Sequence, residues 1–251
     1  IISGTDTDIQ ITTPAITKLD LNGSSGNFRN VTINHASCDA FLEANTTISG
    51  NLTITAGKLT CTTQAGDART LNVAGTGTIG DGSSSADTAT LTATSQDLLL
   101  GSGVTGTHSL VVDVGGTFVG GSGTHTLGSL NIKNSTAAKC TLSSGNTTIN
   151  GEGTSNKAIN IEGSNGVTNF AHGSGTVIIT HDGASDIKAD GSTLALNNLT
   201  INHASANINL KGILTVAGNL EITAGELDTD SSDYALTVTG TTTLTGTLNL
   251  N

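Results

Sequence analysis

The chain has 251 residues, a formal net charge of -11 and no Trp or Met, and only 12% of its residues are charged. Thr, Gly, Ser and Asn together supply 125 residues, half of the sequence. Low charge with many β-branched residues argues against disorder, and the acidic balance argues against nucleic acid as a partner, because phosphate backbones attract basic proteins. No window approaches eighteen consecutive apolar residues, so we expect no membrane insertion.

Apolar residues two positions apart recur along the whole chain, which is the period of a half-buried β-strand. Between these segments lie Gly, Asn, Asp and Ser, which tolerate tight turns and positive φ. The sequence therefore predicts short strands in regular succession and no long helix. In chain order the predicted strands include residues 31–33, 52–54, 71–73, 91–93, 110–112, 130–132, 159–161, 177–179, 199–201, 220–222 and 236–238.

Long stretches of the sequence occur twice. Residues 30–37 (NVTINHAS) return as 198–205 (NLTINHAS), an offset of 168, and residues 50–59 return as 218–227 at the same offset. We therefore predict an internal duplication of about residues 30–80 onto 198–248. A degraded third copy lies at residues 129–132 and 146–149, and a separate match at offset 52 joins residues 118–124 to 170–176.

Short strands at a period near 20 residues are typical of a parallel β-helix, in which each coil supplies strands and turns. We expect one repetitive all-β domain over residues 1–251, with roughly twelve coils of about 20 residues stacked into an elongated rod. The main rival is a β-sandwich, but hairpin turns of the Asn-Gly type occur only at Asn22 and Asn165. The scarcity of aromatic residues predicts a narrow core of Leu, Ile, Val and Ala.

A family resemblance rests on three segments in the second half of the chain. They are NNLTIN at 197–202, GNLEITAGELDT at 218–229 and ALTVTGT at 235–241. They resemble the Thr/Gly/Asn-rich β-solenoid repeats of tailed-bacteriophage fibre and appendage proteins, and those of bacterial repetitive surface adhesins. The resemblance implies a passive rod at the virion surface or outside the cell. Such phage fibres are often homotrimers, and the rod would display or contact host cell-surface glycans.

We accordingly expect a noncatalytic structural rod of a virion that assembles as a homotrimer or with other virion proteins. The alternative is a bacterial extracellular surface adhesin or filament protein. A polysaccharide-degrading enzyme is less favoured, since such sites need paired carboxylates beside basic or aromatic groups. Here the carboxylates are scattered, Tyr234 is the only Tyr, and Arg29 and Arg69 are the only arginines. We predict no catalytic residue, no cofactor and no metal site.

Four weaker patterns have simpler explanations. The duplicated His35 and His203 would lie too many coils apart to share an ion, and the alternating carboxylates of 228–233 lack the Gly and distal Glu of a calcium loop. Thr-x-Thr triplets would suit ice binding only on one face of successive coils. Asn-x-Ser/Thr sequons arise by chance in such a composition. The triplets include 53–55, 76–78, 241–243 and 245–247, and the sequons include those that begin at Asn30, Asn45, Asn51, Asn146 and Asn198.

The three cysteines, Cys38, Cys61 and Cys140, form no CxxC pair. We expect them to be small buried apolar side chains. A Cys38–Cys61 bridge is conceivable only if 23 residues make one structural repeat.

Overall fold

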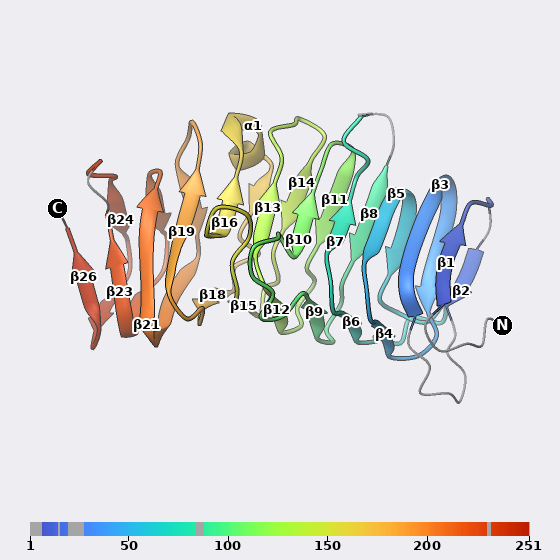
Figure 1. Ribbon diagram of the computed structural model, residues 1–251, viewed down its shortest axis with the longest axis horizontal. Coiled ribbons are helices and arrows are strands. Elements are labelled where there is room, and N and C mark those ends of the chain that lie inside the picture. Colours follow the sequence, from blue (N-terminus) through green and yellow to red (C-terminus); the bar gives the residue numbers. More distant parts are fainter. Residues whose placement is uncertain (1–6, 15, 20–27, 84–87, 230–231, 251) are drawn as a thin grey trace.

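A computed structural model describes residues 7–14, 16–19, 28–83, 88–229 and 232–250. Strands make up 55% of the chain and helix 3%, so the predicted all-β class is confirmed. The chain winds in coils along one axis, with its two ends at opposite ends of the stack (Figure 1). Every pair of named strands among the described residues is parallel, as in a β-helix.

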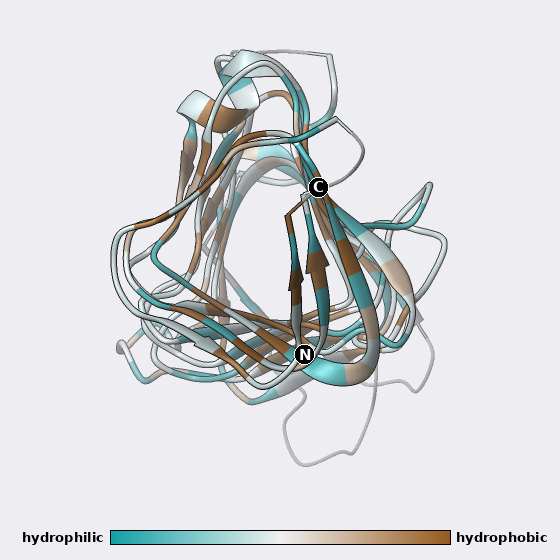
Figure 2. Ribbon diagram, turned by 90° about the vertical axis from the view of Figure 1, so that its left-hand side faces the viewer, coloured by the Kyte–Doolittle hydropathy of each residue, from teal (hydrophilic) through white to brown (hydrophobic). Residues whose placement is uncertain are grey.

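Each coil has three sides, which we call faces A, B and C in the order that the chain visits them; Figure 2 shows this outline along the stack. Face A contains β1 (Thr7–Ile11), the first halves of β3 (Phe28–Leu42) and β5 (Leu52–Thr60), β7 (Gly77–Ile79), β10 (Leu110–Val112), β13 (Leu130–Ile132), β16 (Lys157–Ile161), β19 (Ala184–Ala189), the second halves of β21 (Asn198–Lys211) and β23 (Leu220–Asp228), and β26 (Thr247–Asn249).

The other two faces follow the same rule. Face B contains β2 (Ile16–Leu19), the second halves of β3 and β5, β8 (Ala89–Thr92), β11 (Gly116–Val119), β14 (Lys139–Thr141) and β17 (Phe170–Ala171), and then β20 (Leu194–Leu196), β22 (Leu214–Val216) and β24 (Leu236–Val238). Face C contains β4 (Thr46–Ile48), β6 (Leu71–Val73), β9 (Leu98–Leu100), β12 (His125–Leu127), β15 (Asn146–Ile149), β18 (Thr176–Ile179), the first halves of β21 and β23, and β25 (Thr242–Leu244).

The interior is filled by the apolar doublets of the sequence pattern. Strands such as β6 and β10 have two buried side chains flanking one that points outward, so stacking places Leu, Ile and Val in continuous columns. One cluster of buried apolar residues extends from Ile9 to Leu227. The expectation of a core without large rings is wrong at two positions, because Phe28 and Phe118 are fully buried.

Coil length varies more than the sequence rhythm suggests. Successive rungs of face A are separated by as few as 19 residues, from Ile208 to Leu227, and by as many as 33, from Gly77 to Leu110. Eleven rungs occur on this face within the described ranges. The extra residues of the longer coils lie at the corners, outside the columns of paired strands.

One corner insertion contains helix α1 (Gly163–Thr168), which separates β16 from β17. Face B is interrupted after this point, since β17 pairs with β14 and the later strands β20, β22 and β24 form a sheet of their own. Within the described residues, no helix is long and apolar enough to cross a membrane.

The two long copies of the duplication lie on different faces. Val31 lies on face A, whereas its counterpart Leu199 lies on face C. Ala40 of face B likewise corresponds to Ile208 of face A. From Val31 to Ile187 there are six steps on face A, and two further faces lead to β21, so the 168-residue offset spans six coils and two faces. The second copy is therefore rotated by one face relative to the first.

Candidate functional site

The duplicated NHAS segment forms a sharp corner within a continuous strand. At the first corner His35 Nδ1 accepts a hydrogen bond of 3.1 Å from the backbone N–H of Ser37. The second corner repeats this contact between His203 and the N–H of Ser205 at 3.3 Å. These two histidines therefore satisfy backbone donors at turns. They are turn residues at equivalent positions, as the sequence repeat suggested.

A glycine of the following coil lies directly against each corner. Gly57 has φ +93°, and a Cβ there would lie 2.5 Å from the carbonyl oxygen of His35. Gly225 has φ +85°, and its Cβ would lie 2.5 Å from the carbonyl oxygen of His203. Only glycine fits this combination of positive φ and close backbone approach. The ITAG segment lies one coil after NHAS, and its glycine therefore allows the corners of successive coils to stack.

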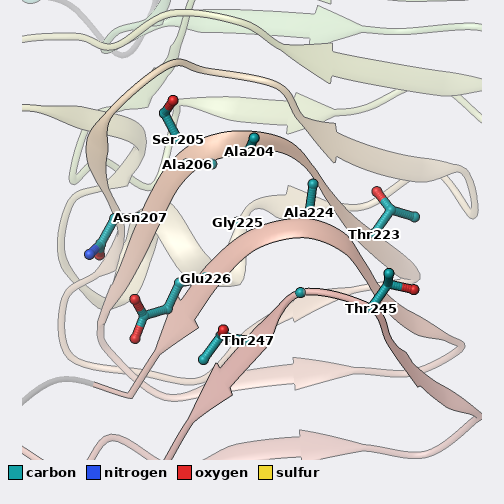
Figure 3. A pocket seen from close by; sticks show the side chains of 11 residues that line it. Ala204, Ser205, Ala206, Asn207, Thr223, Ala224, Gly225, Glu226, Thr245 and Thr247 are labelled. Atoms are coloured by element: carbon teal, nitrogen blue, oxygen red, sulfur yellow. The ribbon is translucent and has the colours of Figure 1, made fainter.

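Each stacked corner leaves a hollow on the outside of the rod. The N-groove lies between corner 36–39 and the next coils at Gly57, Lys58, Thr88 and Thr90, with a volume of about 360 Å³. The C-groove lies between residues 204–207, 223–226 and 245–247, with a volume of about 550 Å³. Figure 3 shows polar side chains of the C-groove on the arcs of successive coils. The duplication has therefore produced the same concave frame near both ends of the rod.

The lining of the two grooves differs in charge. In the N-groove, Asp39 is the register partner of Lys58 on the adjacent coil. The corresponding pair in the C-groove is Asn207 and Glu226. The ammonium of the first groove is thus replaced by a carboxylate in the second. The two grooves can offer similar hydroxyl and backbone groups to ligands of different charge.

Part of the C-groove lining is held by neighbouring coils. Thr223 Oγ1 donates a hydrogen bond of 3.1 Å to the carbonyl oxygen of Ile201 and contacts Asn202 Oδ1 at 2.8 Å. The exposed Ser205 and Asn207 side chains lie on the corner before it. The hydroxyl and amide groups can donate and accept hydrogen bonds and the carboxylate can accept them, as a ligand rich in hydroxyl groups requires.

Asparagine ladders support the corner before each duplicated strand. Asn30 Oδ1 accepts from the backbone N–H of Asn51 at 2.9 Å, and Asn51 Oδ1 accepts from that of Thr76 at 2.8 Å. Asn198 and Asn219 repeat the ladder in the second copy, with distances of 2.8 and 2.9 Å. Sequons at Asn30, Asn51 and Asn198 therefore coincide with coil-to-coil contacts. The recurrence of Asn just before an apolar doublet was the signal for this ladder.

A third hollow contains the chain's only tyrosine. Tyr234 lines it with Ile213, Ser192 and Thr193, and its volume is about 310 Å³. The Ile213 side chain is 44% exposed. An aromatic ring beside hydroxyl groups and an exposed apolar surface is a combination that can stack on a sugar ring. The lone Tyr234 gave no such indication in the sequence.

A polar cluster packs against the outer side of face A near the middle of the rod. Glu162 Oε1 accepts from Lys133 Nζ at 2.9 Å and from the buried Asn160 Nδ2 at 3.3 Å. Burial lowers the pKa of His108, and the nearby charges of Lys157 and Lys133 lower it further while Glu162 opposes them. The His108 ring lies against Gly153 of the corner loop over residues 150–156.

The interior contains one histidine that the sequence analysis did not place there. His125 is fully buried in the face C column, between Leu98 and Thr147 of the adjacent coils. Its ring lies 6.1 Å from that of Phe118, and both ring nitrogens lack a hydrogen-bond partner. Burial lowers the pKa of His125 to about 4. The side chain is a neutral imidazole inside an apolar column.

All three cysteine side chains are buried, which confirms the sequence expectation. Cys38 stacks on Gly57, because Asp39 and Lys58 are register partners and the step between these coils on face B is 19 residues. The 23-residue step that a Cys38–Cys61 bridge would need is therefore absent at this point. Burial raises the pKa of Cys61 to about 12 and that of Cys140 still further.

The remaining candidates are dispersed. Among the described residues, no three His, Cys, Asp or Glu side chains gather as a metal site would require. Asp228 accepts a hydrogen bond from Asn249, and Asp230 of the 228–233 segment lies outside the described residues. Threonines of the first two triplets do stack on face A, where Thr53 and Thr78 are register partners and Thr32 lies before them in the same column. The next two positions of that column are Val111 and Asn131, so the row of stacked threonines ends at Thr78.

No protein-family model matches the chain, and comparisons with curated proteins and with solved structures found no match.

Proposed function

We propose that the chain is a noncatalytic structural rod of a virion, a tail-fibre or appendage protein that contacts the host cell surface. The observation that carries the proposal is the repetition of one corner groove near both ends of a β-helix. Repeated weak sites on a rigid rod suit attachment, because several sites engaged together hold more strongly than one. The location would be the virion surface or the outside of the cell, and the rod would have about twelve coils in all.

We propose a cell-surface glycan as the ligand of the grooves. The C-groove offers the hydroxyls of Ser205, Thr245 and Thr247 together with the amide of Asn207 and the carboxylate of Glu226. Sugars present many hydroxyl groups, and such groups recognise them by donating and accepting hydrogen bonds. With Glu226 in place, the C-groove favours neutral or amino sugars over acidic ones. The net charge of -11 acts in the same direction.

The assembly belongs to the proposal as well. A homotrimer, or contact with other virion proteins, would place several copies of each groove on one particle. Such multiplicity compensates for the small size and open form of each hollow.

The test is retention on immobilised cell-surface polysaccharides of neutral, acidic and amino-sugar type. The proposal predicts weak retention of the intact chain on neutral or amino sugars and a several-fold loss in Asn207→Ala and Glu226→Gln. Glu221→Gln is the matched control, because Glu221 lies on the same strand β23 but is exposed outside the groove. Equal retention of Glu221→Gln and Glu226→Gln would place the contact elsewhere, and release of oligosaccharides would overturn the noncatalytic assignment.

A further inference from the structure

Four polar side chains form a cluster across two adjacent coils on the outer side of face A. They belong to β13 and β16 and the residues directly after them, side by side near the middle of the stack (Figure 1). Asn131 is the register partner of Asn160. Two positions further along each coil, Lys133 faces Glu162, with Nζ and Oε1 2.9 Å apart. Because residues two positions apart point to the same side of a strand, all four lie together.

The two amides of the cluster are buried although they lie on the outer side of the sheet. Asn131 is 2% exposed and Asn160 is 6% exposed, and the ends of their side chains are 2.7 Å apart. Among the described residues, no group forms a hydrogen bond with Oδ1 of Asn160. A buried carbonyl oxygen without a donor costs free energy, so it is uncommon where the side chain has only a structural role.

Glu162 contacts both an amine and an amide. Its Oε1 accepts a hydrogen bond from Lys133 Nζ at 2.9 Å and another from Asn160 Nδ2 at 3.3 Å. A lysine amine is a nucleophile once it has lost a proton, and Nδ2 is the group that leaves when the amide carbon is attacked. One carboxylate oxygen therefore lies where it can take a proton from the nucleophile and give it to the leaving group.

We propose that Lys133 and Asn160 form an isopeptide bond within the chain, with Glu162 as the catalytic base and acid. Glu162 takes a proton from the Lys133 ammonium, and the freed lone pair of Nζ forms a bond to Cγ of Asn160. As the Cγ–Nδ2 bond breaks, two protons have passed from Nζ to Nδ2 through Glu162. The nitrogen leaves as ammonium and Glu162 is again a carboxylate, so the reaction needs no oxidant, reductant or co-reactant.

The neighbouring coil provides a lysine that lacks this arrangement. Lys188 is the register partner of Asn160 on the side away from Asn131. Its Nζ lies 2.8 Å from Oδ2 of Asp190, which is two positions further along its own coil. Lys133 is thus the lysine that shares a carboxylate with the amide of Asn160, and Lys188 is the natural control.

The bond would tie two adjacent coils covalently at the middle of the rod, where otherwise hydrogen bonds and packing hold them. Such a tie suits a rod that is pulled along its axis. The reaction occurs once in each chain and on the chain's own residues, so it adds no activity toward an external substrate. The inference rests on the contacts between β13 and β16 and is independent of the proposed glycan contact.

The test is the mass of the folded full chain. Wild type should be lighter than its sequence mass by one molecule of ammonia, and digestion should give a branched peptide that joins the segments around Lys133 and Asn160. Trypsin should no longer cleave after Lys133, because its amine has become an amide. A wild type of full sequence mass would overturn the inference. Loss of ammonia without the branched peptide, as a succinimide at Asn165 would produce, would overturn it too.

Variants test the role of each residue. Glu162→Gln keeps the size of the side chain but removes the base, and Lys133→Arg keeps the charge but removes the primary amine. Both should have the full sequence mass and no branched peptide, whereas Lys188→Arg and Asn131→Ala should retain the bond. A bond formed as fully in Glu162→Gln as in wild type would contradict the role of Glu162. A bond kept in Asn160→Ala but lost in Asn131→Ala would contradict the assignment to Asn160. Circular dichroism establishes that each variant is folded.

Discussion

The two copies of the duplication have almost the same sequence and the same local contacts, yet they lie on different faces of the rod. The corner at His35 joins faces A and B, and the corner at His203 joins faces C and A. By contrast, Phe118 and Phe170 of the shorter match are two coils apart on one face. The comparison shows that the structural unit is a strand with its following corner, and that this unit can occupy different faces of the coil.

The largest expected effect comes from the glycine at each stacked corner. Gly57→Ala and Gly225→Ala should each lower the free energy of unfolding by about 3 kcal/mol, because positive φ and a backbone clash act together. Gly66→Ala is the control, since Gly66 has φ +100° but nothing within 4 Å of an added Cβ. It should cost only about 1 kcal/mol. Denaturant unfolding measures all three, and equal costs would show that corner stacking is unimportant.

His125 tests the stretch between the two copies, where a polar side chain is buried in a mainly apolar interior. Its pKa of about 4 in the folded state is below the unfolded value of 6.5. Folding is therefore weakened as pH falls from about 6.5 to about 4, by about 3 kcal/mol in total. His125→Leu should remove this pH dependence and add about 1–3 kcal/mol of stability at neutral pH. An unchanged acid transition in the variant would contradict the buried position.

The asparagine ladders should show a smaller and graded effect. Asn51→Ala removes the acceptor for the N–H of Thr76 and should cost about 1 kcal/mol. Asn219→Ala should cost less, because its partner Thr241 is exposed whereas Thr76 is half-buried. Asn146→Ala, at an exposed side chain, should be nearly neutral. Thermal unfolding compares the three variants, and a larger cost at Asn219 would contradict the ladder's place in the stack.

The smallest effect on stability is expected from exchanging the groove charges. Lys58→Gln and Glu226→Lys change exposed or half-buried groups and should alter the free energy of unfolding by less than about 0.5 kcal/mol. Ligand preference should nevertheless shift, with Glu226→Lys retained better on acidic polysaccharides. Retention that is unchanged in both variants would show that the two grooves do not distinguish ligands by charge.

The strands, the parallel stacking and the duplication could be predicted from the sequence because an apolar residue at every second position is a local signal. The rotation of the second copy could not be predicted, since the face on which a strand lies depends on the summed lengths of all preceding corners. The insertion of α1 and the 33-residue step to Leu110 show how irregular these lengths are.

The functional residues likewise include some that the sequence indicated and some that it did not. The corner histidines and the ITAG glycines could be identified from the sequence repeat, although the groove between them depends on how successive coils stack. His125 lies two positions before Leu127 in an alternating strand, but residues 125–127 were not among the predicted strands. The hollow beside Tyr234 brings together Ser192 and Tyr234, which are 42 positions apart, and no sequence signal indicated it.

The central claim is that the second copy lies on face C, and disulfide formation between adjacent coils tests it most directly. In a background without the native cysteines, Ile178→Cys with Thr200→Cys joins register partners that both point outward on face C. Neighbouring rungs are about 4.8 Å apart, within the reach of a disulfide. The account predicts rapid oxidation of this pair and none for Lys188→Cys with Thr200→Cys. Rapid bridging of the second pair instead would place residue 200 over face A and contradict the rotated duplication.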